Sequence, residues 1–313
     1  MVDSSASLNE TSAGQQPSDQ DDHNGPQFTA ELPVSAPTLQ DALCILSQHN
    51  TDRIMNATEY TGLFRKPRLV EFLFNACSQF DDDCAADIRY KALAMFDEFM
   101  LAHVQQLYGV AQHSSRDWLT VEGRISNQVA LRALTCAHLA SKQQSVDQHL
   151  RISFVGGYLR SIGQCYTREQ LHQSEHRVLQ TLNYRIAKPC PLDYIEFLLE
   201  IVGLKLDHQI DLSSYWHWSL WVLDHVCLNT DRIYRRVFEQ TTGSKNVDRS
   251  RLCYAQCDYM LLACGVITTA CGCVDTVVPC ADVMAELLHT ITKLPVSDIG
   301  EMCTAILRDV LED

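Results

Sequence analysis

Cysteine and histidine are the residues of this 313-residue chain best suited to hold a metal or to act as nucleophiles. The sequence has 14 cysteines and 12 histidines. Four cysteines on one apolar segment, Cys253, Cys257, Cys264 and Cys271, follow helical spacing, whereas a zinc site typically uses Cys-x2-Cys pairs. His217 lacks a second histidine four residues further on. We therefore predict free, mostly buried thiols and neither a metal nor a cofactor.

The sequence also lacks the motifs on which common active sites are built. It contains no phosphate-binding Gly-rich loop, no His-Glu-x-x-His helix and no nucleophile elbow. We therefore predict a protein that is not an enzyme and that acts by binding other molecules.

Lys142 and Glu175 are two charged residues in otherwise apolar or helical surroundings. Lys142 ends the apolar run that starts at Ile125, and Glu175 lies within a segment with a separate apolar stripe. In one interpretation, Lys142 stabilises a helix C-terminus by ~0.3 to 1 kcal/mol and Glu175 is a solvated surface residue. In the other, both side chains serve a binding partner.

Helical periodicity predicts an all-α protein. Apolar residues recur at intervals of three and four along almost the whole chain, and no stretch alternates long enough to require a strand. Thr167 and Gln170 form a capping box that marks one helix start. The predicted helices are 39–48, 67–80, 83–108, 125–142, 148–161, 168–182, 192–202, 212–239, 252–273, 281–293 and 298–312.

The two halves of the chain resemble each other. "PRLVEFLFNAC" from Pro67 is similar to "PLDYIEFLLEI" from Pro191, and three later segment pairs match in order at nearly the same offset. We infer two five-helix domains of one design, joined near the prolines at 189 and 191. The offsets place Ala270 and Thr304 where the first half has Lys142 and Glu175. The charges are therefore not needed to build the helices, which favours a role in binding.

Charge and composition indicate an acidic, disordered N-terminal tail, residues 1–37. The formal net charge is -14, and the first 52 residues contain no Lys or Arg but eight acids. Such a balance disfavours direct nucleic-acid binding, which requires clustered positive charge. The arginines from Arg232 to Arg251 alternate with acids, which predicts a solvated helix end. No apolar run reaches the ~18 residues of a membrane span, and no secretory signal is evident, so we expect a cytosolic or nuclear protein.

Several segments resemble the successive helices of the cyclin box, namely "LVEFLF", "MFDEFM", "LTCAHLASK" and "YTREQLHQSEHRVLQTLNYRI". "KPCPLDYIEFLLEIVGL" resembles the passage into a second cyclin fold. The resemblance implies an N-terminal cyclin box at 38–188 and a C-terminal cyclin-like fold at 189–313. It also implies that Lys142 and Glu175 are the pair with which cyclins bind a cyclin-dependent kinase.

Other positions depart from the cyclin pattern. The resemblance places a structural ion pair at Lys66 and Asp97. It places a substrate-docking patch at Arg65, Leu69 and Phe72, where arginine replaces two apolar residues of the stretch Arg65-Lys-Pro-Arg-Leu69 and Phe72 replaces the usual tryptophan. Gln143 and Gln144 stand where cyclins have an acidic pair. Docking of substrates at this patch is therefore doubtful.

The resemblance also implies a biological role. "DALCILSQHN" and "RKPRLVEFLF" are most similar to a meiotic member of the family that promotes crossover maturation. We accordingly expect a nuclear protein that is chromosome-associated in meiotic cells, with the cytoplasm as a second location. Its expected partners are a cyclin-dependent kinase and meiotic recombination proteins. Two alternatives are a scaffold that binds recombination or replication-clamp proteins without a kinase, and a DNA-binding protein of the same fold.

Overall fold

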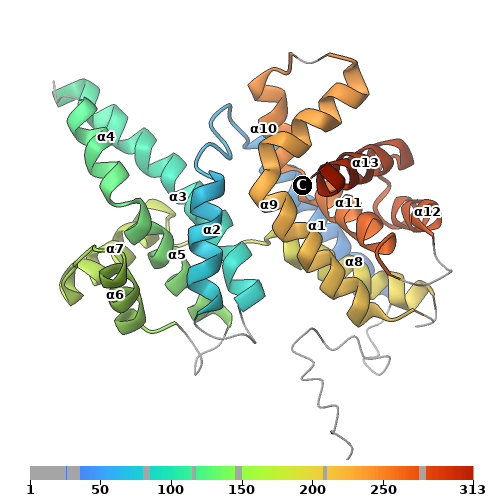
Figure 1. Ribbon diagram of the computed structural model, residues 1–313, viewed down its shortest axis with the longest axis horizontal. Helices are drawn as coiled ribbons and strands as arrows, with labels where there is room; N and C mark the ends of the chain where they lie inside the picture. Colours follow the sequence, from blue (N-terminus) through green and yellow to red (C-terminus); the bar gives the residue numbers. More distant parts are fainter. Residues whose placement is uncertain are drawn as a thin grey trace, which may run out of the picture.

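The computed structural model describes residue 26 and residues 36–79, 85–114, 118–144, 150–206, 210–244, 246–274 and 280–312. Within these ranges the protein has thirteen helices and no strand (Figure 1), which confirms the all-α prediction. Almost all of the predicted tail, 1–37, lies outside the described residues. The helices are α1 Ala36–Met55, α2 Pro67–Ser78, α3 Ala85–Ser114, α4 Trp118–Asn127, α5 Val129–Gln144, α6 Ile152–Ser161, α7 Arg168–Thr181, α8 Pro191–Lys205, α9 Leu212–Thr242, α10 Arg249–Cys257, α11 Tyr259–Cys271, α12 Ala281–Thr292 and α13 Val296–Glu312.

Buried apolar side chains form two clusters, each around one central helix. In the first cluster, α5 is buried continuously from Ala133 to Ser141 and is surrounded by α2, α3, α6 and α7. In the second, α11 is buried from Leu262 to Cys271 among α8, α9, α12 and α13. A helix that is apolar all round is stable in water only when other helices cover every face, as the sequence predicts for the region that ends at Lys142.

The same helix pairs pack in both halves of the chain. The contacts of α2 with α3, α3 with α5 and α5 with α7 recur as α8 with α9, α9 with α11 and α11 with α13. The N-terminal helix α1 packs on the second half, against α10 and α11, and Figure 1 shows it there among the C-terminal helices. The boundary between the two domains at 188 and 189 stays a prediction.

Each half contains one short helix more than the sequence predicts. The predicted polar loop before Ile125 includes α4, and the predicted helix 252–273 is two helices, α10 and α11, that meet at Asp258 with a bend of 73°. The Asp258 side chain accepts hydrogen bonds from the backbone of Leu261 at 2.9 Å and from Asn50 Nδ2 at 2.9 Å. These bonds begin a new helix at Asp258 and attach it to α1.

Within the described residues no single helix is long and apolar enough to cross a membrane, although the bent pair α10 and α11 together passes a test of length and composition. All thirteen cysteines in these ranges are free thiols. Cys253, Cys257, Cys264 and Cys271 are buried, as their helical spacing predicts.

Candidate functional site: a lysine–glutamate pair on α5 and α7

The two helices that carry Lys142 and Glu175 are fixed by local signals and by contacts between them. The predicted capping box is present at the start of α7: Thr167 N donates to Gln170 Oε1 at 2.8 Å, and Gln170 N donates to Thr167 Oγ1 at 3.3 Å. Within the α5–α7 contact, the hydroxyls of Thr135 and Ser174 are 2.7 Å apart. This buried polar contact sets the register of the two helices and so places Glu175 beside the end of α5.

Lys142 and Glu175 form an ion pair, in which Lys142 Nζ donates to Glu175 Oε1. The Lys142 side chain is 40% exposed and the Glu175 side chain 16%. Burial would raise the pKa of the Glu175 carboxyl, but the hydrogen bond and the charge of Lys142 outweigh it, and the pKa is lowered. The carboxylate is therefore charged at neutral pH and holds the ammonium group in place.

Two histidines complete the surroundings of Glu175. His138 Nε2 lies 3.8 Å from Glu175 Oε1, and His172 Nδ1 lies 3.5 Å from Oε2. The sequence analysis did not select either residue, although His138 precedes Lys142 by one helical turn and His172 precedes Glu175 by three residues. That spacing is the signal that could have found them.

The end of α5 is also attached to the start of α6. Ser141 Oγ donates to the carbonyl of His138 at 2.9 Å and accepts from Leu150 N at 2.9 Å, and His138 Nδ1 contacts the carbonyl of Leu150. All three residues are buried. The backbone beneath Lys142 is thereby held on a rigid support.

The Gln144 side chain forms hydrogen bonds at the junction of the two halves. Its amide donates to Asp87 Oδ2, and its Oε1 accepts from Lys91 Nζ at 3.3 Å. Lys91 also pairs with Asp193 of α8 at 3.4 Å. An acid at position 144 would be repelled by the carboxylate of Asp87, so the uncharged glutamine suits this network. Gln143, in contrast, is exposed.

The predicted pairing of Lys66 with Asp97 is wrong by one residue. Asp97 Oδ2 accepts from Arg65 Nη2 at 3.2 Å and from Gly62 N at 3.0 Å. Lys66 is the N-cap of α2, with an extended backbone (φ -75°, ψ 142°), and it is exposed. Successive side chains of an extended segment point in opposite directions, so Arg65 faces inward when Lys66 faces solvent.

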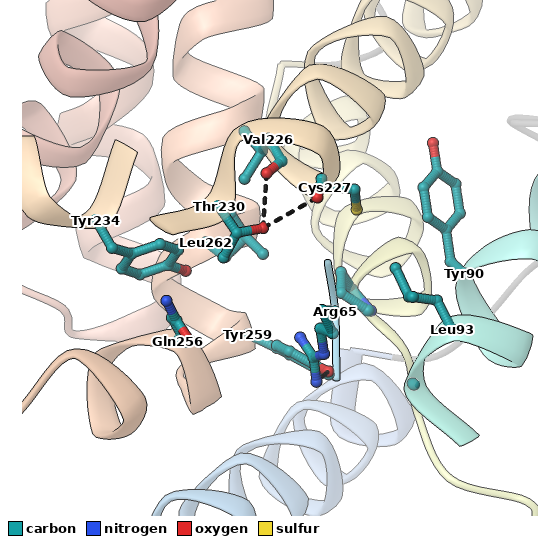
Figure 2. A pocket seen from close by; sticks show the side chains of 12 residues that line it. Arg65, Tyr90, Leu93, Val226, Cys227, Thr230, Tyr234, Gln256, Tyr259 and Leu262 are labelled. Carbon is teal, nitrogen blue, oxygen red and sulfur yellow. Dashed lines mark hydrogen bonds between the residues drawn. The ribbon is translucent and has the colours of Figure 1, made fainter. Parts of the chain in front are cut away.

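Arg65 also joins the first half of the chain to the second. Its Nη2 donates to the hydroxyl of Tyr259 at the start of α11 at 3.1 Å, and Figure 2 shows the two side chains side by side. The Arg53 guanidinium lies 3.8 Å from the centroid of the same ring. Burial alone would lower the pKa of Arg65. The interactions with Tyr259 and Asp97 outweigh burial, and the pKa is raised.

The structure does not bring Arg65, Leu69 and Phe72 together as an exposed patch. Arg65 points inward with its side chain 12% exposed. Leu69 and Phe72 pack on the first core, where Phe72 meets Tyr158 edge to face at 5.7 Å. These residues therefore support the fold. The absence of substrate docking at this patch stays a prediction.

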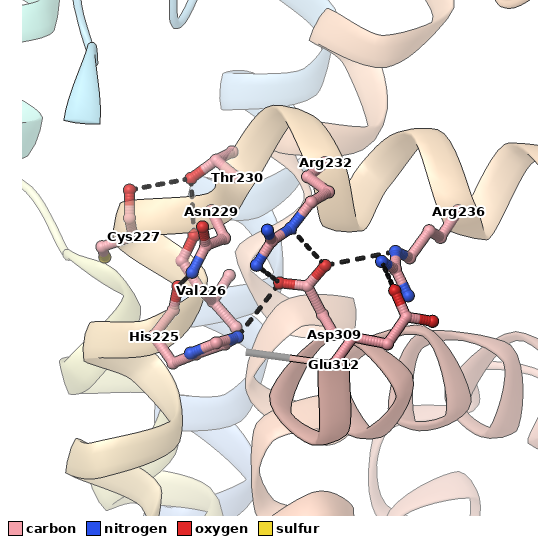
Figure 3. Close-up of polar contacts among 9 residues, drawn as sticks. All are labelled: His225, Val226, Cys227, Asn229, Thr230, Arg232, Arg236, Asp309 and Glu312. Atoms are coloured by element: carbon pink, nitrogen blue, oxygen red, sulfur yellow. Dashed lines mark hydrogen bonds and ion pairs between the residues drawn. The ribbon is translucent and has the colours of Figure 1, made fainter.

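Two of the arginines near the end of α9 take part in ion pairs with α13, whereas Arg235 is exposed as predicted. Asp309 of α13 is fully buried and pairs with Arg232 Nε at 2.6 Å, Arg236 Nε at 3.1 Å and His225 Nε2 at 3.1 Å (Figure 3). The acid that binds them is some 70 residues away in sequence, so periodicity gives no signal for the pairing. In the described part of the chain, no group of three His, Cys, Asp or Glu side chains could hold a metal ion.

The helix order that repeats around α5 and α11, together with an ion pair between α5 and α7, is the arrangement that the resemblance to the cyclin box implies. No family model matches the chain. The chain is 30% identical over 288 residues to Cyclin N-terminal domain-containing protein 1 of Homo sapiens, which covers 88% of this chain and 84% of the human protein. It is also 30% identical over 246 residues to the protein of that name in Mus musculus, covering 75% and 72%. The chain therefore belongs to the cyclin-fold family, in the group of Cyclin N-terminal domain-containing protein 1.

Proposed function

We propose that this cyclin-like chain is a non-enzymatic regulatory protein that binds a cyclin-dependent kinase and promotes the maturation of meiotic crossovers. The observation that carries the kinase proposal is the geometry of Lys142 and Glu175. The role in meiosis is supported by the similarity to a meiotic member of the family. We further propose that the protein acts in the nucleus, on meiotic chromosomes.

The ion pair is suited to hold backbone carbonyls of a partner. An ammonium group has three donors, and the contact with Glu175 uses one. Lys142 is exposed enough for the others to reach a partner, while Glu175 restricts its rotamers. At the matching place of the second half, Ala270 is fully buried. The charge at 142 is thus not a requirement of the helix packing.

The test is co-purification of kinases with the full chain from meiotic cells, using Lys142→Ala, Glu175→Ala and the double variant. Truncation of one member of an interfacial charge pair typically costs ~2 to 5 kcal/mol of binding, so we expect cyclin-dependent kinases to be lost from all three. Gln143→Ala is the matched control, because Gln143 is the exposed neighbour of Lys142 on the same helix end. Kinase binding that persists in the double variant would refute the proposal.

A kinase-independent scaffold for recombination or replication-clamp proteins is the second candidate. It is favoured by the packing of Leu69 and Phe72 and by the use of Gln144 inside the fold, because the surface then lacks two features of cyclins that act with kinases. In the same purification, recombination proteins that co-purify equally with wild type and the double variant, without any kinase, would support this candidate.

A further inference from the structure

A second polar surface of the first half lies between α5 and α7, next to the Lys142–Glu175 ion pair, and neither of those two residues lines it. It is a hollow of about 570 Å³ whose lining includes two arginines, Arg132 and Arg177, and two histidines, His172 and His176. The other lining residues are uncharged, and no Asp or Glu belongs to the described lining. Residues two apart on a helix point about 200° apart, so Arg177 and Glu175 face opposite sides.

Arg132 lies at the base of this hollow and its charge has no counter-ion in the described residues. Its Nη1 donates to Ser174 Oγ at 2.7 Å, and its Nη2 donates to Gln128 Oε1 at 2.8 Å, so both acceptors are neutral. Its buried Nε has no hydrogen-bond partner within the described residues. Burial, and next the charge of Arg177, lower the pKa of Arg132.

The positive charges of Arg132 and Arg177 also act on His103 of α3. Its ring stacks on Phe99 with centroids 5.0 Å apart, and the Arg132 guanidinium lies 5.8 Å from the Phe99 centroid. Burial, followed by the charges of Arg132 and Arg177, lowers the pKa of His103 to about 4. Three cationic or titratable groups from three helices therefore meet without a neutralising acid among the described residues near them.

Three other largely buried arginines of the described residues pair with acids, whereas Arg53 lies on the ring of Tyr259. Arg65 meets Asp97, Arg89 meets Asp224 at 2.9 Å, and Arg236 meets both Asp309 and Glu312. A desolvated guanidinium is costly unless an anion compensates it. The contrast at Arg132 indicates that the compensating anion comes from outside the described chain.

We propose that the hollow between α5 and α7 binds a phosphorylated serine or threonine side chain of a partner protein. A phosphate group carries close to two charges and three acceptor oxygens, and guanidinium groups bind it in bidentate fashion. Arg132 and Arg177 supply the guanidinium groups, with Gln170 and Gln173 on the rim. Two arginines in one hollow match a single phosphate. A nucleic-acid backbone needs a longer positive track, which a chain of net charge -14 does not favour.

This site is separate from the ion pair proposed to hold a kinase. Neither Lys142 nor Glu175 lines the hollow, and Arg177 points away from Glu175, although His172 belongs to the lining and lies 3.5 Å from the Glu175 carboxylate. Phosphate binding is accordingly expected to survive Lys142→Ala.

The experiment measures binding of the purified full chain to a fluorescein-labelled peptide pool with one central phosphoserine, using the same pool with serine as reference. Arg177→Gln is the deciding variant, because Arg177 is exposed and its replacement leaves the core intact. Arg168→Gln is the matched control, since Arg168 is an exposed arginine of the same helix outside the hollow. Arg132→Gln serves as a second variant, with circular dichroism to verify folding.

We expect the phosphorylated pool to bind wild type and Arg168→Gln alike, and to bind Arg177→Gln at least roughly tenfold more weakly, the loss typical of a hydrogen bond to a charged group. Inorganic phosphate should compete and should shift the Nε–H resonance of Arg132 in the NMR spectrum. Equal binding of the two pools, or binding unchanged by Arg177→Gln, would overturn the proposal. A 20-base-pair DNA duplex that binds through Arg177 and displaces the pool would overturn it too, by assigning the hollow to nucleic acid.

Discussion

Replacement of Glu196 by glutamine is expected to stabilise the protein strongly at pH 8 and only slightly at pH 5. Glu196 lies on α8 at the junction of the two halves, where its Oε1 accepts from Trp216 Nε1 at 3.2 Å. Burial, followed by the charge of Asp87, raises the pKa of Glu196 to about 7, against the hydrogen bond from Trp216. Asp193 adds to the rise and Lys91 opposes it. Glutamine keeps the acceptor oxygen and cannot ionise.

The magnitude follows from the difference between the ordinary value of 4.5 and the folded value of about 7. The folded state holds this proton more tightly than the unfolded state, so the contribution to stability is complete below about pH 4.5 and is lost as the pH rises through about 7. At about 1.4 kcal/mol for each pH unit between the two values, ionisation costs at most about 3 kcal/mol. We expect the stabilisation by Glu196→Gln to grow from about 1 kcal/mol at pH 5 to about 3 kcal/mol at pH 8.

The assay is urea unfolding followed by circular dichroism at several pH values between 5 and 8, with the free energy of unfolding compared between variant and wild type at each pH. The comparison cancels the contribution of groups that do not interact with Glu196. Asp87 interacts with it, so the difference also includes a change in the titration of Asp87, whose pKa burial raises. Glu71→Gln, which alters an exposed glutamate of α2, controls for the loss of a negative charge. A stabilisation that does not change with pH, or a variant less stable than wild type at pH 8, would refute the reasoning.

Five further substitutions, in three experiments, test the packing of the fold. Arg65→Ala should lower the free energy of unfolding by about 3 to 5 kcal/mol, because it leaves a buried acid unpaired, whereas Lys66→Ala should change it by less than about 0.5 kcal/mol; urea unfolding distinguishes them. Asp309→Asn removes the charge that two arginines and a histidine share, and a loss of about 3 kcal/mol is expected, with a lower Tm as the readout. Gly265→Ala places a methyl group against the side chain of Met302 in α13 and should lower the free energy of unfolding by about 1 to 3 kcal/mol. Gly157→Ala meets nothing within 4 Å and should stabilise α6 by up to about 1 kcal/mol. The two variants should therefore shift the Tm in opposite directions, and shifts of the same sign in thermal unfolding would contradict this expectation.

Much of the helical organisation follows from short-range patterns. The apolar stripes and the capping box at Thr167 predict most helices to within a few residues. The repeat of the two halves predicts two domains of one design, and the helix contacts α2–α3, α3–α5 and α5–α7 recur in the second half. The break at Asp258 was missed because the apolar period continues across it, and the bonds that end one helix there include one to Asn50, more than 200 residues away in sequence.

The candidate sites too were predicted in part from the sequence and in part only from the structure. The residue types and the internal repeat are enough to select Lys142 and Glu175, and the structure joins the two side chains in one ion pair. Their role in binding a kinase stays a prediction. The structural pair was assigned to Lys66, because sequence similarity cannot resolve which of two adjacent cations faces inward. The direction of the chain at the start of α2 decides in favour of Arg65.

The sequence by itself thus determined the fold class, the order of the helices and the two charged residues of the kinase-binding proposal, because periodicity, capping and repetition act over short distances along the chain. Only the tertiary structure decided which ions are paired, that Gln144 belongs to the junction of the two halves, and that Arg132 and Arg177 meet without an acid among the described residues around them. Electrostatic energy depends on the distance between charges in space and on their burial. Helix packing sets both quantities, and the spacing of residues along the chain does not contain them.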